Sequence, residues 1–252
     1  MVGKTYVYVP KSWEKYLYDI KKLRNPSPCF YEIDMTNRCN LNCAWCTTTA
    51  ARKKNTKDAP YESLIRLVDD ALGKDLGVTF AGGGEPTLHP RFRDVIKHAI
   101  PAIGIGLVSN GTLVDEIRFY LETTKDHKNS WVRLSLNDRP INDGLRKLFN
   151  DYPNRIGISI IVEHEELSYP AEELAPLAKF IRKTTPHNIV PNGTRPEDCI
   201  GRKFHKIFEP DGTVAWCCQA RGRGGAPPEF CFDDCRWSKV DIEEAWKGNP
   251  WT

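Results

Sequence analysis

Residues 30–46 read FYEIDMTNRCNLNCAWC and join a predicted strand to three closely spaced cysteines. The strand is expected at 30–35, and Cys39, Cys43 and Cys46 follow it within a stretch of eight residues. Thiolates are preferred ligands of zinc and of iron–sulfur clusters. Three cysteines are one short of a closed structural zinc site, whereas a 4Fe–4S cluster bound by three cysteines keeps one iron open for a further ligand. A zinc site completed by Cys29 is the alternative.

The composition is that of a globular protein, with 252 residues of which 40% are hydrophobic and 27% charged. A net charge of +3 is too small to indicate a nucleic-acid partner. No apolar run approaches the roughly 20 residues of a membrane span, and the N-terminus lacks the apolar core of a signal peptide. We therefore expect a cytoplasmic protein with no membrane partner. In a reducing compartment, nine cysteines indicate metal binding rather than a disulfide framework.

Predicted strands and helices alternate along most of the chain. Strands are predicted at 30–35, 77–81, 103–108, 131–136, 156–162 and 187–190. Helices are predicted between them, at 61–72, 91–100, 113–123, 141–149 and 171–183. Such alternation predicts an α/β fold with a parallel sheet and right-handed crossovers. Six units predict a partial (β/α)6 barrel, whose active site is expected at the C-terminal ends of the strands.

Glycine-rich and polar motifs follow the next three predicted strands. Residues 81–90 read AGGGEPTLHP after the second strand, 109–111 read SNG after the third, and 133–137 read RLSLN on the fourth. Because parallel strands end at the same edge of a sheet, we expect these motifs to lie beside the three cysteines. Glycines let a ligand approach the backbone closely. Taken singly, the motifs are also compatible with ordinary turns, in which Gly, Ser and Asn are common.

Together, the four motifs resemble the radical S-adenosylmethionine (radical SAM) superfamily. The resemblance rests on the Cys-x3-Cys-x2-Cys spacing with an aromatic residue, Trp45, before the third cysteine, and on the Gly-Gly-Glu motif at 83–85. It covers roughly residues 29–192. In that family, the open iron of a 4Fe–4S cluster binds S-adenosylmethionine. One electron, here expected from an external flavodoxin- or ferredoxin-like reductant, then cleaves it to methionine and a 5′-deoxyadenosyl radical, which abstracts a substrate hydrogen.

The resemblance also implies which residues bind S-adenosylmethionine. The glycine motif is expected to offer backbone and carboxylate partners to the methionyl ammonium. Ser135 and Asn137, at the end of the fourth strand, resemble the ribose-binding position. Ser109, at the end of the third strand, is expected to line the site, and Asn192, after the sixth strand, is expected near the adenine. The expected contacts are Gly83, Gly84, Glu85, Ser109, Ser135, Asn137 and Asn192.

A second group of cysteines lies in the last quarter of the chain, around a β-hairpin predicted at 204–208 and 213–217. Four thiolates complete a closed site, for zinc or for a second cluster. The arrangement resembles the auxiliary-cluster domains called SPASM and Twitch, and the shorter Twitch form with one auxiliary 4Fe–4S cluster suits the length. The expected ligands are Cys199, Cys217, Cys231 and Cys235.

Two features depart from the pattern of those domains. The last two cysteines are spaced Cys-x3-Cys where Cys-x2-Cys is common, and a short helix that often precedes them is predicted after them, at 240–246. Cys217 is adjacent to Cys218, and the spacing from Cys199 favours Cys217 as the ligand. Cys218 and Cys29 are then left over, and a small buried hydrophobic residue is the default for Cys29.

The sequence thus predicts three parts: an N-terminal extension at 1–28, a radical SAM partial barrel at 29–192, and a small C-terminal iron–sulfur (Twitch-like) β-hairpin domain at 193–252. Because fewer than 30 residues precede the first barrel strand, we expect no fused domain that binds a leader peptide.

An auxiliary cluster suits net two-electron oxidation, so we expect an oxidoreductase that dehydrogenates a small polar substrate such as an amino sugar or a nucleotide. A peptide-crosslinking or peptide-epimerising enzyme and a nucleoside-isomerising enzyme fit the same build. A zinc-binding structural or regulatory protein is the alternative from another class. Oxidation also needs a base, but no spacing distinguishes the candidates, so the catalytic base is not identified. The candidates are Arg139, Glu163, His164 and Glu165.

Overall fold

The computed structural model describes residues 30–43, 46, 48, 56–137, 139–161, 169–184 and 205–215. Cys39, Cys43 and Cys46 lie within these ranges, as do all the expected cofactor contacts except Asn192. The predicted division into three parts stays a prediction, because both outer parts lie largely outside the described residues. Further predicted residues outside them are Cys29, Glu163, His164, Glu165, Asn192, Cys199, Cys217, Cys218, Cys231 and Cys235.

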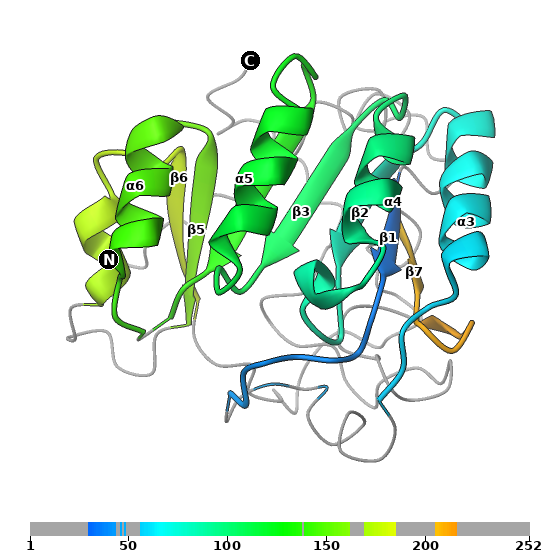
Figure 1. Cartoon of the computed structure of the whole chain (residues 1–252), viewed down its shortest axis with the longest axis horizontal. Helices are drawn as coiled ribbons and strands as arrows, with labels where there is room; N and C mark the ends of the chain where they lie inside the picture. Colours follow the sequence, from blue (N-terminus) through cyan, green and yellow to red (C-terminus); the bar gives the residue numbers. More distant parts are fainter. Residues whose placement is uncertain are drawn as a thin grey trace, which may run out of the picture.

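Six parallel strands follow one another across one sheet in the order of the sequence (Figure 1). They are β1 Phe30–Asp34, β2 Gly77–Ala81, β3 Ile105–Ser109, β4 Ser130–Ser135, β5 Ile156–Ile161 and β6 Phe180–Thr184. In the described part of the chain β6 pairs with β5 and not with β1, so the barrel is open. This confirms the predicted α/β fold with its parallel sheet.

Four helices cover one face of the sheet and connect its first five strands (Figure 1). They are α3 Tyr61–Gly73, α4 Phe92–Ala99, α5 Val114–Thr123 and α6 Asp143–Asp151. These helices and the first five strands begin and end within two residues of their predicted bounds. A short 3-10 helix, η2 Pro86–Leu88, follows β2. None of the helices in the described ranges is long and apolar enough to cross a membrane.

The apolar core lies between the sheet and these helices. Alternate residues of each strand point toward the helices, and both layers contribute side chains that are fully buried. Burying each such side chain stabilises the fold by roughly 1.5–3 kcal/mol. The fully buried side chains include Ile33, Leu64, Val68, Phe80, Ile96, Leu107, Ile117, Leu134, Leu148 and Ile158.

Two glycine–aromatic pairs occupy the opposite face of the sheet. Gly106 on β3 is the neighbour of Trp131 on β4, and Gly157 on β5 is the neighbour of Phe180 on β6. A Cβ atom on Gly106 would lie 2.3 Å from the Trp131 ring, and one on Gly157 would lie 2.2 Å from the Phe180 ring. Both rings therefore lie against the backbone of the neighbouring strand, where a side chain would displace them.

The sixth unit differs from its prediction. The helix predicted at 171–183 is wrong, because the chain instead forms the 3-10 helix η3 Pro170–Leu174 followed by strand β6. Pro176 explains the difference, since proline inside a helix removes a hydrogen bond and clashes with the preceding turn. The strand predicted at 187–190 lies outside the described residues. Because β6 ends at Thr184, the prediction for Asn192 no longer follows from a strand end.

The predicted hairpin is confirmed as β7 His205–Phe208 and β8 Val214–Ala215. β7 pairs in parallel with β1, so the hairpin continues the main sheet beyond β1 (Figure 1). The rings of Tyr31 and Phe208 pack edge to face, with their centroids 4.9 Å apart. In the connecting turn, the Glu209 amide donates to the Thr213 carbonyl at 2.8 Å, and Gly212 has a φ of +89°.

Gly212→Ala should destabilise the protein by about 1–2 kcal/mol, because its positive φ is strained for any residue with a Cβ atom. No atom lies within 4 Å of the added Cβ, so backbone conformation alone causes the loss. Gly73 at the end of α3 is the matched control, because its Cβ would also meet open space while its φ is not in the left-handed region. Urea unfolding should show a loss in Gly212→Ala and none in Gly73→Ala, and equal stabilities would contradict this account.

Candidate functional site

The loops that follow β1, β2 and β3 meet at one edge of the sheet. The Glu85 amide after β2 donates to the Arg38 carbonyl after β1 at 2.7 Å. The Asn110 amide after β3 donates to the Glu85 carboxylate at 2.6 Å. The motifs that the sequence places after these strands are therefore in direct contact, as the parallel fold predicts.

The three clustered cysteines lie in the loop after β1. Cys39, Cys43 and Cys46 are half-buried and form no disulfide. The Cys39 sulfur accepts hydrogen bonds from the Leu41 amide at 3.4 Å and from the Asn110 side-chain amide at 3.7 Å. Donors directed at a sulfur are typical of metal-bound thiolates, whose charge they stabilise.

The spacing of the side chains also bears on the kind of metal centre. Within the described ranges, no three His, Cys, Asp or Glu side chains form a group that could hold a metal ion. In a 4Fe–4S cluster each cysteine binds a different iron, so its sulfurs lie farther apart than those around a single ion. The choice between a 4Fe–4S cluster and a zinc ion completed by Cys29 is left to the metal analysis proposed below.

The glycine motif packs directly against the cysteine loop. A Cβ atom on Gly84 would lie 2.1 Å from the Arg38 carbonyl oxygen and 2.7 Å from that of Thr36, which leaves no room for a side chain. The Gly83 amide donates to the buried Asp34 carboxylate at 3.0 Å, and the Gly83 carbonyl accepts from the Thr48 hydroxyl at 2.7 Å. Gly84 is therefore required for contact between the two loops.

Glu85 is a buried carboxylate that joins the ends of β2 and β3. It is 1% exposed and accepts hydrogen bonds from the Thr87 amide and hydroxyl, the Ser109 hydroxyl and the Asn110 amide, at 2.6–3.2 Å. Burial raises the pKa of Glu85, although these hydrogen bonds oppose the rise. Ser109 therefore also has a structural role, because its hydroxyl donates a hydrogen bond to the Glu85 carboxylate.

Asn110 is a site residue that was not among the contacts expected from the sequence, although Ser109 beside it was. Its side-chain amide donates to Cys39 and, at 2.9 Å, to the Asn40 side chain, while its oxygen accepts from the amide and hydroxyl of Thr112. It therefore connects the end of β3 to the cysteine loop. No spacing rule could have selected it, because the contact depends on how the two loops pack.

Two of the expected cofactor contacts lie at the C-terminal end of β4: Ser135 is its last residue, and Asn137 follows it. Asn137 is 6% exposed, has a φ of +50°, and accepts from the Ile161 amide at 3.0 Å, so its side chain joins the ends of β4 and β5. Ser135 is half-buried, and its carbonyl accepts from the Arg139 guanidinium at 3.0 Å. Arg139 also donates to the Asn110 carbonyl. An arginine stays protonated in proteins, so Arg139 fits a donor and not the base for which it was a candidate.

Comparison with known proteins now identifies the domain. Residues 33–154 match the family model of the Radical SAM superfamily. The chain contains a radical SAM domain. This radical SAM domain includes the cysteine loop, the glycine motif and the ends of β3 and β4.

Relatives of known name share parts of this domain. A tungsten-containing aldehyde ferredoxin oxidoreductase cofactor-modifying protein of Pyrococcus furiosus is 33% identical over 87 residues, which are 33% of this chain and 24% of that protein. The chain thus spans about a quarter of the length of that relative.

Two solved structures share the fold at 13% identity. One is BtrN in complex with AdoMet and 2-DOIA, with a TM-score of 0.55 over 81% of this chain and 78% of that one. The other is Streptococcus suis SuiB bound to precursor peptide SuiA, with a TM-score of 0.51 over 94% of this chain and 69% of that one.

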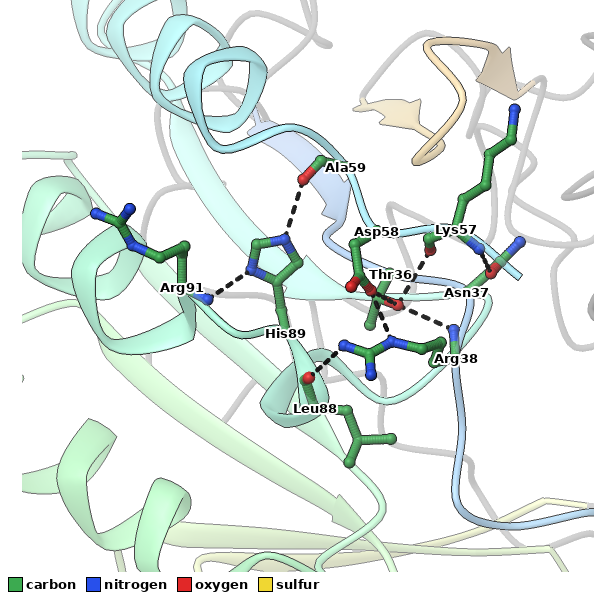
Figure 2. A network of polar contacts seen from close by, with 9 residues as sticks. All are labelled: Thr36, Asn37, Arg38, Lys57, Asp58, Ala59, Leu88, His89 and Arg91. Atoms are coloured by element: carbon green, nitrogen blue, oxygen red, sulfur yellow. Dashed lines mark hydrogen bonds and ion pairs between the residues drawn. The ribbon is translucent and has the colours of Figure 1, made fainter. Parts of the chain in front are cut away.

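A network of polar contacts closes the base of the radical SAM cysteine loop (Figure 2). Thr36 and Asp58 form an isolated antiparallel bridge, and the Thr36 hydroxyl donates to the Asp58 carboxylate at 2.6 Å. The Arg38 guanidinium donates to the same Asp58 oxygen and to the Leu88 carbonyl, each at 2.8 Å. The two ends of the loop that contains the three cysteines are thereby joined to each other and to η2.

The charge on Asp58 depends on this network. Burial raises the pKa of Asp58, but hydrogen bonds from Thr36 and Arg38, with the charge of Arg38, together lower it below its ordinary value. The carboxylate therefore stays ionised, which is the form that accepts both donors at once.

His89, at the end of η2, completes the network as a buried neutral imidazole (Figure 2). Its Nε2 lies 3.0 Å from the Ala59 carbonyl, and its Nδ1 accepts from the Arg91 amide at 3.1 Å. A carbonyl accepts and an amide donates, so these partners assign the proton to Nε2. Burial lowers the pKa of His89, although the Ala59 carbonyl opposes the change.

Gly84→Ala should destabilise the protein by about 3 kcal/mol or more, because the added Cβ would overlap the Arg38 carbonyl and the backbone cannot move away without breaking the site. Gly83→Ala is the matched control, since its Cβ would lie 3.5 Å from the Thr48 methyl, an ordinary contact. Urea unfolding of the metal-free protein should place Gly83→Ala within about 1 kcal/mol of the wild type. Equal losses of unfolding free energy in both variants would contradict the claim that the site at Gly84 has no room for a side chain.

His89 should make stability depend on pH below about 6.5, the ordinary histidine value. Its pKa is lowered in the folded chain, so the unfolded chain binds more protons as the pH falls through 6.5. The free energy of unfolding therefore decreases as the pH falls. We expect the free energy of unfolding to fall by about 1 kcal/mol more between pH 7.5 and 5.5 in the wild type than in His89→Gln. Parallel curves for the two proteins would contradict this assignment.

Proposed function

We propose that this protein is a radical SAM enzyme that binds a 4Fe–4S cluster at Cys39, Cys43 and Cys46 and S-adenosylmethionine at the adjoining strand ends. The observation that carries this proposal is the contact between a loop of three half-buried thiols and the Gly83–Gly84–Glu85 backbone at the C-terminal edge of a parallel sheet. When bound, the cluster and S-adenosylmethionine supply a 5′-deoxyadenosyl radical that removes a hydrogen atom from the substrate.

The residues of the chain would orient the cofactor and keep water away from it. The buried carboxylates of Asp34 and Glu85 flank the glycine motif, which gives it a negative environment suited to the methionyl ammonium. The remainder of S-adenosylmethionine is proposed to contact Ser109, Ser135, Asn137 and Asn192. Because Ser109 and Asn137 already support neighbouring loops, a cofactor there would meet side chains that are held in place.

We propose oxidation of a small polar substrate, such as an amino sugar or a nucleotide. On β4, Trp131, Arg133 and Ser135 alternate with the buried Val132 and Leu134, so they lie on the sheet face opposite the helices. A guanidinium, a hydroxyl and a ring suit a polar molecule that offers hydrogen-bond acceptors. BtrN, which shares the fold, was solved in complex with AdoMet and 2-DOIA, and this supports a small substrate.

A peptide substrate is the second candidate. Its support is the fold shared with SuiB, which was solved bound to a precursor peptide, and that likeness covers 94% of this chain. In either case we propose an auxiliary 4Fe–4S cluster at Cys199, Cys217, Cys231 and Cys235 and an external flavodoxin- or ferredoxin-like reductant.

Metal analysis and product formation test the proposal. Protein purified without oxygen should contain about eight irons and eight sulfides per chain if both clusters form, and about four if the auxiliary cluster is absent. With S-adenosylmethionine and dithionite it should produce 5′-deoxyadenosine. Cys39→Ala should abolish that product, whereas Cys29→Ala, the control, should retain it. Zinc without sulfide, with metal lost in Cys29→Ala, would establish the structural zinc alternative instead.

Isotope transfer then separates the two substrate classes. Deuterated amino sugars or nucleotides and deuterated peptides are each supplied with S-adenosylmethionine, and the 5′-deoxyadenosine is analysed by mass spectrometry. Deuterium from the small molecule supports our proposal, and deuterium from the peptide alone supports the second candidate.

A further inference from the structure

The Thr48 hydroxyl lies between a proposed cluster ligand and the glycine motif. Its oxygen is 3.1 Å from the Cys46 sulfur and donates to the Gly83 carbonyl at 2.7 Å. Thr48 is 7% exposed, so solvent screens neither contact strongly. The Gly83 amide, in the preceding peptide group, is in turn bound to Asp34 at 3.0 Å, so Gly83 is held on both sides of its Cα atom.

The number of protons on these groups limits how the hydroxyl can be shared. A threonine hydroxyl has one proton to donate, and it can also accept. A cysteine that binds iron is a thiolate and only accepts. Thr48 then faces two acceptors, the Cys46 sulfur and the Gly83 carbonyl, and a donation to one is withdrawn from the other.

We propose that Thr48 is a positioning residue that couples the cluster at Cys46 to the cofactor at Gly83. The inference rests on the proposed function, and it takes the Gly83 carbonyl as the backbone group that accepts from the methionyl ammonium. A carbonyl that already accepts from a cation is a weaker acceptor for a second donor. Cofactor binding therefore shifts the Thr48 proton toward the Cys46 thiolate.

The consequence is a change in how easily the cluster is reduced. Hydrogen bonds to cluster sulfurs are among the factors that set its reduction potential, because they stabilise the more negative, reduced state. A donation that strengthens when the cofactor binds would make the cluster easier to reduce at that moment. Since coupling between two sites is reciprocal, the reduced cluster would also favour the bound cofactor.

Thr48→Val and Thr48→Ser test this role, because valine keeps the shape and removes the hydroxyl while serine keeps the hydroxyl. Thr124→Val is the matched control, since Thr124, directly after α5, is a fully buried threonine whose hydroxyl donates to the Tyr120 carbonyl. The cluster potential of each loaded protein is measured by spectroscopic redox titration, with and without S-adenosylmethionine.

We expect Thr48→Val to lower the potential so that, at a fixed applied potential, the ratio of reduced to oxidised cluster falls about tenfold, which is about 59 mV for one electron. The rise caused by S-adenosylmethionine should also be smaller than in the wild type. Thr48→Ser and Thr124→Val should match the wild type in both measurements.

Each outcome is decisive. Equal potentials in Thr48→Val and the wild type, or a loss in Thr48→Ser as large as in Thr48→Val, would overturn the coupling while leaving the proposed function intact. If Thr48→Val does not fold, Thr48→Ala takes its place, because alanine also removes the hydroxyl and adds no bulk, and its potential is compared with that of Thr48→Ser. A wild-type chain that takes up no cluster would overturn the proposed function itself and the coupling with it.

Discussion

The close approach of Gly84 to the backbone of residues 36–38 is the contact on which the rest of the site depends. The cysteine loop and the glycine motif come from different strands, and they share a surface because no side chain separates them. The hydrogen bond from the Glu85 amide to the Arg38 carbonyl then fixes their relative position. The other contacts of the radical SAM site join loops whose relative position this backbone contact sets.

Buried polar groups give the site a single arrangement. Asp34 and Glu85 are almost inaccessible to water, and a buried carboxylate is costly unless its oxygens accept hydrogen bonds. Here those bonds come from the amides of Gly83, Thr87 and Asn110, which belong to loops after β2 and β3. An alternative packing of the loops would leave the carboxylates unsatisfied, so the network selects the observed one.

Much of this could be predicted from the sequence, and the exceptions have physical reasons. Strands such as Gly77–Ala81 and the motifs at their ends follow from short apolar runs and from the shared edge of a parallel sheet. The sixth unit differs from its prediction because Pro176 lies within the helix predicted at 171–183, and the chain forms η3 and β6 instead. Asn110, Asp58 and Thr48 could not be identified, because their roles depend on contacts between loops that are far apart in sequence.

The pairing of β7 with β1 has a consequence for how the chain folds. Phe30 is the partner of His205, so this contact closes a far longer loop than any pairing between neighbouring strands. Loop closure of that kind is entropically costly and slow. Among the described strands, one edge of β1 therefore stays unpaired during synthesis until residues 205–208 have emerged from the ribosome, and unpaired edges invite aggregation. Among the described strands, β1 is made before the others, yet it gains its second neighbour only after β2, β3, β4 and β5 have gained theirs.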